Sequence, residues 1–174
     1  MPDIYCDDDL QDYTGLTCGV EKGRITALGL VLPSSALTDP SDNSEWTTNT
    51  GASPQTAWVI TDGVRGEMPR ATDTEEDGFG NEATQLTGAE HSANLHVLGI
   101  KDNVDFSNIV NKKKWHVALA YSNGDMLYIA VPCTVVFRPF IPQDLKSTGY
   151  WDVQIKWSSI DNPAVYTTPT ILQA

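Results

Sequence analysis

Apolar residues recur at every second position in several short stretches of the chain, which is the pattern of β-strands with one buried face. The most regular stretch is 149–157, where the alternating residues are Trp151, Val153, Ile155 and Trp157. Alternation and intervening turn residues together predict strands at 24–32, 56–61, 115–121, 126–136 and 149–157. The chain is therefore expected to be built mainly from short strands.

A tight hairpin is predicted between the strands 115–121 and 126–136. Asn123 and Gly124 lie between them, and this dipeptide favours the two-residue turns of antiparallel hairpins. Pro132 interrupts the second strand and has no N–H to donate, so we expect a bulge or an edge position there.

One short helix is predicted over 103–114, with Asn103 or Asp105 as its N-cap. Its apolar residues share one helical face, and the lysines 112–114 complement the dipole at its C-terminal end. A helix this short is marginal in isolation, so it must pack on a sheet. The elements together predict one structural domain, 1–174, that is mainly β: an antiparallel β-sandwich or barrel with one flanking short helix and long loops.

Two polar stretches separate the predicted strands. Segment 38–54 is rich in Ser, Thr, Asn, Asp and Pro, which predicts a long loop. Segment 70–93 has six acidic residues against one basic residue. Because structureless loops of this length are uncommon in compact domains, this segment is either disordered in isolation or a β-hairpin that becomes ordered against a neighbouring subunit.

The chain is strongly acidic, with 23 Asp and Glu against 11 Lys and Arg and a net charge of −12. Nucleic-acid binding depends on cations that displace counterions, so a DNA- or RNA-gripping role is not expected. A surface past which DNA slides without binding would suit this charge. No apolar run approaches the ~18 residues of a membrane span. The acidic N-terminus does not resemble a signal peptide, so we expect a soluble protein made in the cytoplasm.

No catalytic, cofactor-binding or metal site is predicted. Cys6, Cys18 and Cys133 lack the number and spacing of a disulfide scaffold or zinc site, and buried thiols are expected. A bond between Cys6 and Cys18 across a hairpin stays open. The acidic run Asp7–Asp9 could hold a hard cation, but it lacks the glycine and distal glutamate of a calcium loop. A solvated acidic terminus explains the run better.

The histidines and carboxylates form no recognisable constellation. His91 and His96 are an odd number of residues apart, which places them on opposite faces of a strand and prevents them from sharing a metal easily. Carboxylates available for a glycoside-hydrolase pair are Glu45, Asp62, Glu67 and Glu82. Nothing in the sequence marks any of them as buried or paired.

Three segments in the C-terminal two thirds carry a resemblance to a known group of proteins. They are Gly78–His91 (GFGNEATQLTGAEH), Asn103–Asn111 (NVDFSNIVN) and Tyr150–Pro163 (YWDVQIKWSSIDNP). In this order they resemble virion proteins of bacteriophages that infect Bacteroidetes, including the crAss-like group. Within that group the likeness is to tail-tube-like or neck and tail ring subunits, and it covers residues 75–165.

The resemblance implies a tail-tube-like fold with two packed antiparallel sheets, a flanking helix and an extended loop or hairpin that contacts adjacent subunits. It also implies a homo-oligomeric ring of six or twelve copies in the virion, whose channel passes DNA without specific binding. Further partners would be other tail, neck or portal proteins, with no cofactor and no membrane. Intersubunit contacts are expected in 38–54 and 70–93, and the residues singled out are Trp46, Arg70, Phe79, Glu82 and His91. Trp46 is expected to be an exposed indole within a polar loop.

Other classes of function compete with a ring subunit. A carbohydrate-binding β-sandwich module would use exposed aromatic side chains in a row, and a capsid-surface (head decoration) protein would be a second non-enzymatic role. A small hydrolase would need a buried carboxylate pair at catalytic spacing.

Overall fold

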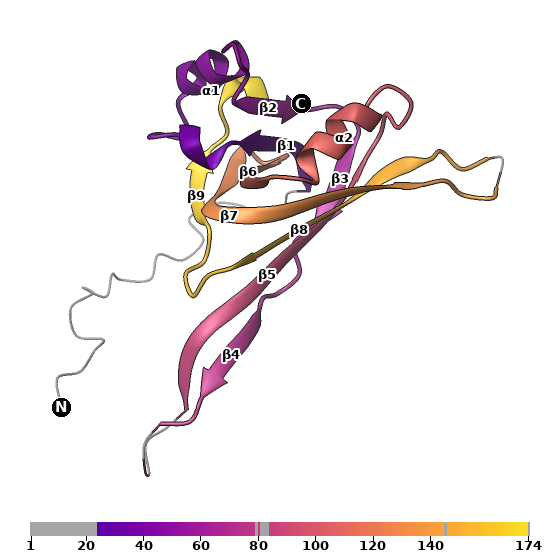
Figure 1. The fold of residues 1–174 in the computed structure, drawn as a ribbon. Coiled ribbons are helices and arrows are strands. Elements are labelled where there is room, and N and C mark those ends of the chain that lie inside the picture. The colour runs from indigo at the N-terminus through magenta and orange to yellow at the C-terminus, as the bar shows by residue number, and fades with distance from the viewer. Residues whose placement is uncertain (1–23, 79, 81–83, 145, 174) are drawn as a thin grey trace.

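A computed structural model describes residues 24–78, 80, 84–144 and 146–173. Its nine strands form one antiparallel sheet that is not closed into a barrel (Figure 1). The strand order is β2-β1-β6-β7-β8-β5-β3, with β4 also paired to β5 and β9 to β7. The predicted mainly β class is confirmed. The strands belong to one sheet instead of two packed sheets, and the described residues contain two α-helices where one was predicted.

The elements have the following bounds along the chain. The strands are β1 (Ile25–Val31), β2 (Ala57–Ile60), β3 (Val64–Glu67), β4 (Thr72–Glu76), β5 (Gln85–Val97), β6 (Lys114–Tyr121), β7 (Asp125–Phe140), β8 (Tyr150–Ser158) and β9 (Ala164–Thr167). The helices are α1 (Asn43–Thr50) and α2 (Val104–Val110), with short 3-10 turns η1 (Pro33–Ser35) and η2 (Thr170–Leu172). Within the described part of the chain, no helix is long and apolar enough to cross a membrane.

The two longest strands exchange partners along their length. β7 lies between β6 and β9 at its start, and it pairs with β8 from Thr134 to Phe140. Pro132 lies at this change of partner, where the register with β6 also shifts, so the predicted bulge is confirmed. β5 pairs with β4 in its first half and with β3 and β8 in its second half.

The main core lies on one face of the sheet. The sheet curls so that β1 and β3, which are distant in the strand order, contact each other. The alternating apolar residues of β8 point into this core, as their spacing predicted. Two tryptophans, Trp58 and Trp115, meet edge to face there with ring centroids 5.2 Å apart.

A second, smaller core lies on the opposite face, beneath α1, β9 and η2. Because both faces are covered there, every residue of β6 from Trp115 to Ala120 is buried. His116 lies on this second face and is 7% exposed, and its Nδ1 is 3.4 Å from the Tyr128 hydroxyl. His116 is therefore on the face of β6 opposite the main core and is buried in the small one.

The prediction of a long loop over 38–54 is wrong in its central part, which forms α1. Asp42 caps the helix by accepting a hydrogen bond from the Ser44 N–H at 2.8 Å. Glu45 accepts from the backbone N–H of Thr38 at 2.7 Å. The spacing of Asp42 and Glu45 matches the capping-box pattern, a local signal that outweighs the polar composition of this segment.

The second helix occupies the predicted place, although it is shorter than predicted. α2 ends at Val110 because Asn111 turns away and Lys114 already begins β6. Phe106 packs edge to face on Phe137 of β7, with ring centroids 5.9 Å apart. The expected docking of the helix on the sheet is therefore confirmed.

Candidate assembly surfaces

A two-stranded ribbon projects from the body of the protein (Figure 1). We call it the arm: β4 together with Gln85–Glu90 of β5. Every residue of β4 is exposed, and so are the first three residues of β5, so neither face of the outer arm packs on its own chain. A two-stranded hairpin without a packed face is marginally stable in water. Of the two outcomes predicted for 70–93, the structure has the hairpin.

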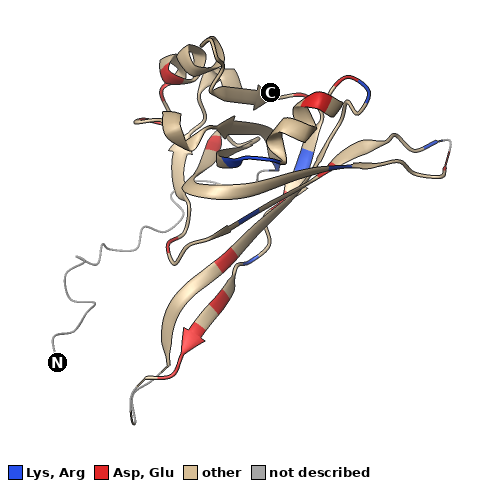
Figure 2. Cartoon of the chain, viewed as in Figure 1, with Lys and Arg blue, Asp and Glu red and all other residues tan. Residues whose placement is uncertain are grey.

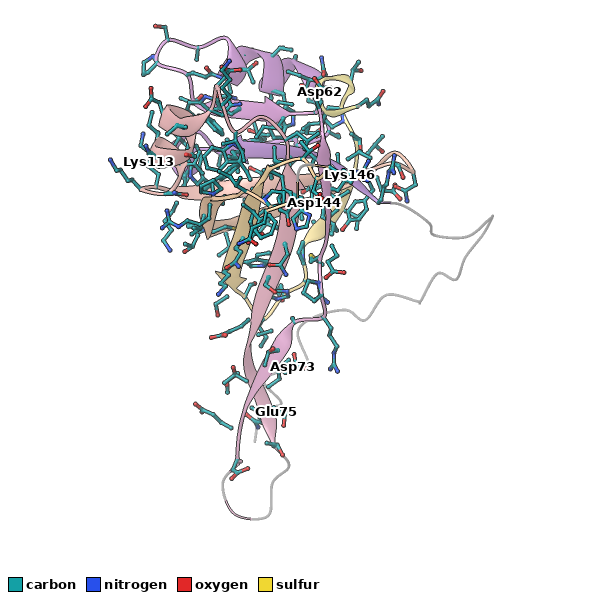
Figure 3. All side chains as sticks on the ribbon, turned by 90° about the vertical axis from the view of Figure 1, so that its right-hand side faces the viewer. Asp62, Asp73, Glu75, Lys113, Asp144 and Lys146 are labelled. Carbon is teal, nitrogen blue, oxygen red and sulfur yellow. The ribbon has the colours of Figure 1, made fainter. Side chains whose placement is uncertain are left out.

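The arm is acidic along its length (Figure 2). Asp73, Glu75 and Glu76 belong to β4, and Glu90 lies opposite Thr72 on β5. The side chains of Asp73 and Glu75 stand away from the ribbon (Figure 3). Leu86, which lies opposite Glu75, is the large apolar exception and is 40% exposed.

The root of the arm is fastened to the sheet by aromatic stacking and hydrogen bonds. The His91 ring lies parallel to the Trp157 indole, with centroids 5.0 Å apart. His91 Nε2 is 3.0 Å from the Ser159 carbonyl, and the Ser159 N–H donates to the carbonyl of Ala89 at 3.0 Å. The base of the arm is therefore packed and hydrogen-bonded to the rest of the sheet.

The five residues predicted to make intersubunit contacts lie in different environments. Arg70 is exposed at the start of the arm and forms an ion pair with Asp73 at 3.1 Å. His91 is 5% exposed and packs on its own chain. Phe79 and Glu82 lie outside the described residues.

The expectation of an exposed indole at Trp46 is wrong. Trp46 is completely buried under α1, and its Nε1 donates to the Pro40 carbonyl at 2.9 Å. Its ring lies against Gly29 of β1, where a side chain would leave no room. Trp46 therefore holds α1 on the sheet.

A row of stacked rings lies on the outer face of the sheet. Tyr150 stacks on His96 at a centroid distance of 4.1 Å and on Phe140 at 5.0 Å, both at 27°. Phe140 is 49% exposed. No direct signal in the sequence indicates this row, because its members come from three strands that only the sheet places side by side.

An apolar pocket of about 210 Å³ opens beside α2, at the far end of β5 from the arm tip. Its aromatic walls are Trp58, Phe106, Phe137 and Trp151. Leu98 lines the rim and is 50% exposed. A single apolar side chain is the kind of group that such a pocket accommodates.

The candidate metal ligands and carboxylates lie in separate places in the described part of the chain. No three His, Cys, Asp or Glu side chains in that part come together as a metal site. Glu45 is used in the cap of α1, and Asp62 and Glu67 are exposed on the surface. Glu82, Cys6, Cys18 and the acidic run Asp7–Asp9 lie outside the described residues.

Burial shifts the pKa of several groups in the two cores. It raises the pKa of the Cys133 thiol to about 12 and that of the Tyr128 hydroxyl to about 12. It lowers the pKa of His116. Each of these shifts keeps the group neutral, as expected for a packing residue.

Comparison with known proteins identifies no family for this chain. No protein-family model matches the sequence. No curated protein shows significant similarity to it.

Proposed function

We propose that this protein is a structural subunit that assembles with copies of itself through its arm. The observation that carries the proposal is the exposure of both faces of the outer arm. A ribbon of this kind gains little from its own chain, whereas a neighbouring subunit would supply the missing contacts. The specific assembly we propose is a ring in the tail or neck of a bacteriophage virion, as the sequence resemblance implies.

The charge of the chain supports a ring through which DNA passes. Acidic surfaces repel phosphate, so a channel lined by them would not retain the genome. Acidic residues outnumber basic residues by 23 to 11 over the whole chain. The Lys and Arg residues of the described part of the chain come from several elements, and four lysines lie in segment 101–114 (Figure 2).

Native mass spectrometry of the purified chain over a range of concentrations tests the proposal. The expected result is an oligomer with one fixed number of copies, and negative-stain images that show closed rings. A variant in which a short turn replaces residues 74–87 should remain folded and lose the oligomer. A chain that stays monomeric at every concentration would contradict the proposal.

The stacked row of His96, Tyr150 and Phe140 favours a second candidate, a carbohydrate-binding module. Exposed aromatic rings on a sheet bind sugars by stacking. In this row, however, Tyr150 uses both ring faces on its neighbours, which leaves less free ring surface than a flat platform would. Titration with an oligosaccharide panel separates the two candidates: a sugar-binding module would bind saturably and lose binding in Tyr150→Ala.

A further inference from the structure

A single strand joins an isolated apolar side chain to an apolar pocket. β5 begins on the arm, where Leu86 is exposed, and ends at Val97, which lines the aromatic pocket beside α2. At about 3.3 Å per residue, the stretch from Leu86 to Val97 spans roughly 36 Å. The arm therefore cannot reach the pocket of its own chain, but it can reach the pocket of another copy.

The pocket offers a mainly apolar surface, and two of its side-chain N–H donors are in use. The Trp151 indole N–H donates to the Gly99 carbonyl at 3.3 Å. The Asn103 amide donates to the same carbonyl at 2.7 Å. Because these donors are already in use, the pocket favours an apolar side chain over a ligand that needs hydrogen bonds.

Charge around the two features is complementary. The arm carries Asp73, Glu75, Glu76 and Glu90 beside the single cation Arg70, which is paired with Asp73. The segment 101–114, which forms α2 and its flanks, has four lysines against two aspartates. Asn103 and Phe106 of this segment line the pocket, whereas Asp62 follows the pocket residues of β2 on the other side. An acidic arm that approaches from the side of α2 would meet the lysines of 101–114, which favours this orientation of two copies.

We infer that Leu86 of one copy occupies the aromatic pocket beside α2 of the next copy, with the acidic arm lying along the lysines of 101–114. This inference rests on the proposed self-assembly and names the contact that produces it. Leu86 and the pocket lie at opposite ends of β5, so the contact is head-to-tail. Each pair of copies therefore keeps one Leu86 and one pocket that are not yet in contact. Repetition of such a contact generates a ring when the rotation closes.

Two variants, each tested alone, examine the two sides of this contact. Leu86→Asp replaces the inserted apolar side chain of the arm with a charged one. Leu98→Glu places a charge at the pocket rim, where it also repels the acidic arm. Both residues are exposed, so the monomer should fold normally, as checked by circular dichroism. Loss of one buried leucine contact should weaken self-association at least about tenfold in sedimentation experiments.

Mixing the two variants provides the sharper test. The Leu86→Asp chain keeps an intact pocket, and the Leu98→Glu chain keeps an intact arm. A mixture therefore has one working contact per pair and should form a one-to-one heterodimer that grows no further. Absence of this heterodimer, with both variants folded and the unaltered chain assembled, would overturn the inference.

Ile141→Asp is the matched control, since Ile141 follows the end of β7 and, at 76%, is the most exposed large apolar side chain of the described residues. It should leave assembly unchanged. If it dissociates the assembly while Leu86→Asp does not, the pocket receives a different segment and the assignment to Leu86 is wrong. If the unaltered chain assembles and Leu86→Asp and Leu98→Glu assemble equally well, only this inference fails. A monomeric unaltered chain contradicts the proposed function itself.

Discussion

The side chain of Asn111 completes the hydrogen bonding of the Phe137 backbone. Its Nδ2 donates to the Phe137 carbonyl at 3.1 Å, and the Phe137 N–H donates to its Oδ1 at 2.7 Å. The pairing of β6 with β7 stops at Lys114 and Thr134, before Phe137. The Asn111 carboxamide therefore takes the place of a neighbouring strand there. The same residue ends α2, and it therefore couples the helix to the sheet beside the aromatic pocket.

Replacing Asn111 should destabilise the protein more than its partial exposure would suggest. Asn111→Ala leaves two polar groups of the buried Phe137 backbone without partners, which costs about 1–3 kcal/mol. Urea denaturation measures the loss, with Asn162→Ala as an exposed control that should change little. An equal effect of the two substitutions would contradict the assigned role.

Gly29 should tolerate no side chain. A Cβ there would lie 2.6 Å from Cη2 of Trp46, whose ring is enclosed on the small core. Gly29→Ala should therefore cost about 1–3 kcal/mol through overpacking. Gly88→Ala, on the arm with open space around it, should change stability by less than about 0.5 kcal/mol. Thermal denaturation at low protein concentration compares the two, and a neutral Gly29→Ala would show that Trp46 can move aside.

His116 should make stability depend on pH. Burial lowers its pKa in the folded protein, so the unfolded chain takes up the proton first as pH falls. The contribution of His116 is complete above the unfolded pKa of 6.5 and is lost as pH falls from there toward the lowered folded pKa. The drop in urea midpoint between about pH 7.5 and about pH 5.5 should be smaller in His116→Gln than in the unaltered chain. Equal drops would show that His116 does not titrate with unfolding.

The Cys133 thiol should be unreactive in the folded protein. Burial raises its pKa to about 12, and the thiol donates to the Val131 carbonyl at 3.1 Å. A thiol reagent near pH 8 should therefore label Cys133 only after denaturant is added. Peptide mapping by mass spectrometry identifies the labelled cysteine and compares the folded protein with the denatured one. Rapid labelling in the folded state would contradict the burial.

Local patterns in the sequence predicted much of the fold. The alternation in 149–157 correctly placed Trp151, Val153, Ile155 and Trp157 in the main core. The Asn123-Gly124 turn is present between β6 and β7, with Gly124 at a φ of 93°. These features follow from period and turn chemistry within a few residues, which the sequence displays directly.

Other features escaped prediction because they depend on distant partners. The composition of 38–54 concealed α1, although Asp42 and Glu45 carried a capping signal. Burial of Trp46 follows from the space over Gly29, seventeen positions earlier in the chain. Arrangement of the strands in one open sheet, instead of a sandwich or barrel, likewise depends on pairings between distant segments.

The arm illustrates the difference between what the sequence determines and what depends on the tertiary structure. The acidic, glycine-containing sequence of 70–93 left a hairpin or disorder as the two predictions, because charged side chains are costly to bury. The last residues of the segment, including His91 and Ala93, are nevertheless buried. In the structure β4 pairs with the first half of β5, which forms the hairpin. β5 extends beyond its pairing with β8, so the hairpin projects from the sheet. Only the folded chain placed Leu86 and the aromatic pocket at opposite ends of one strand, since the pocket walls come from β2, α2, β7 and β8. A local pattern records which face of a strand is apolar, whereas a pocket exists only where distant segments meet.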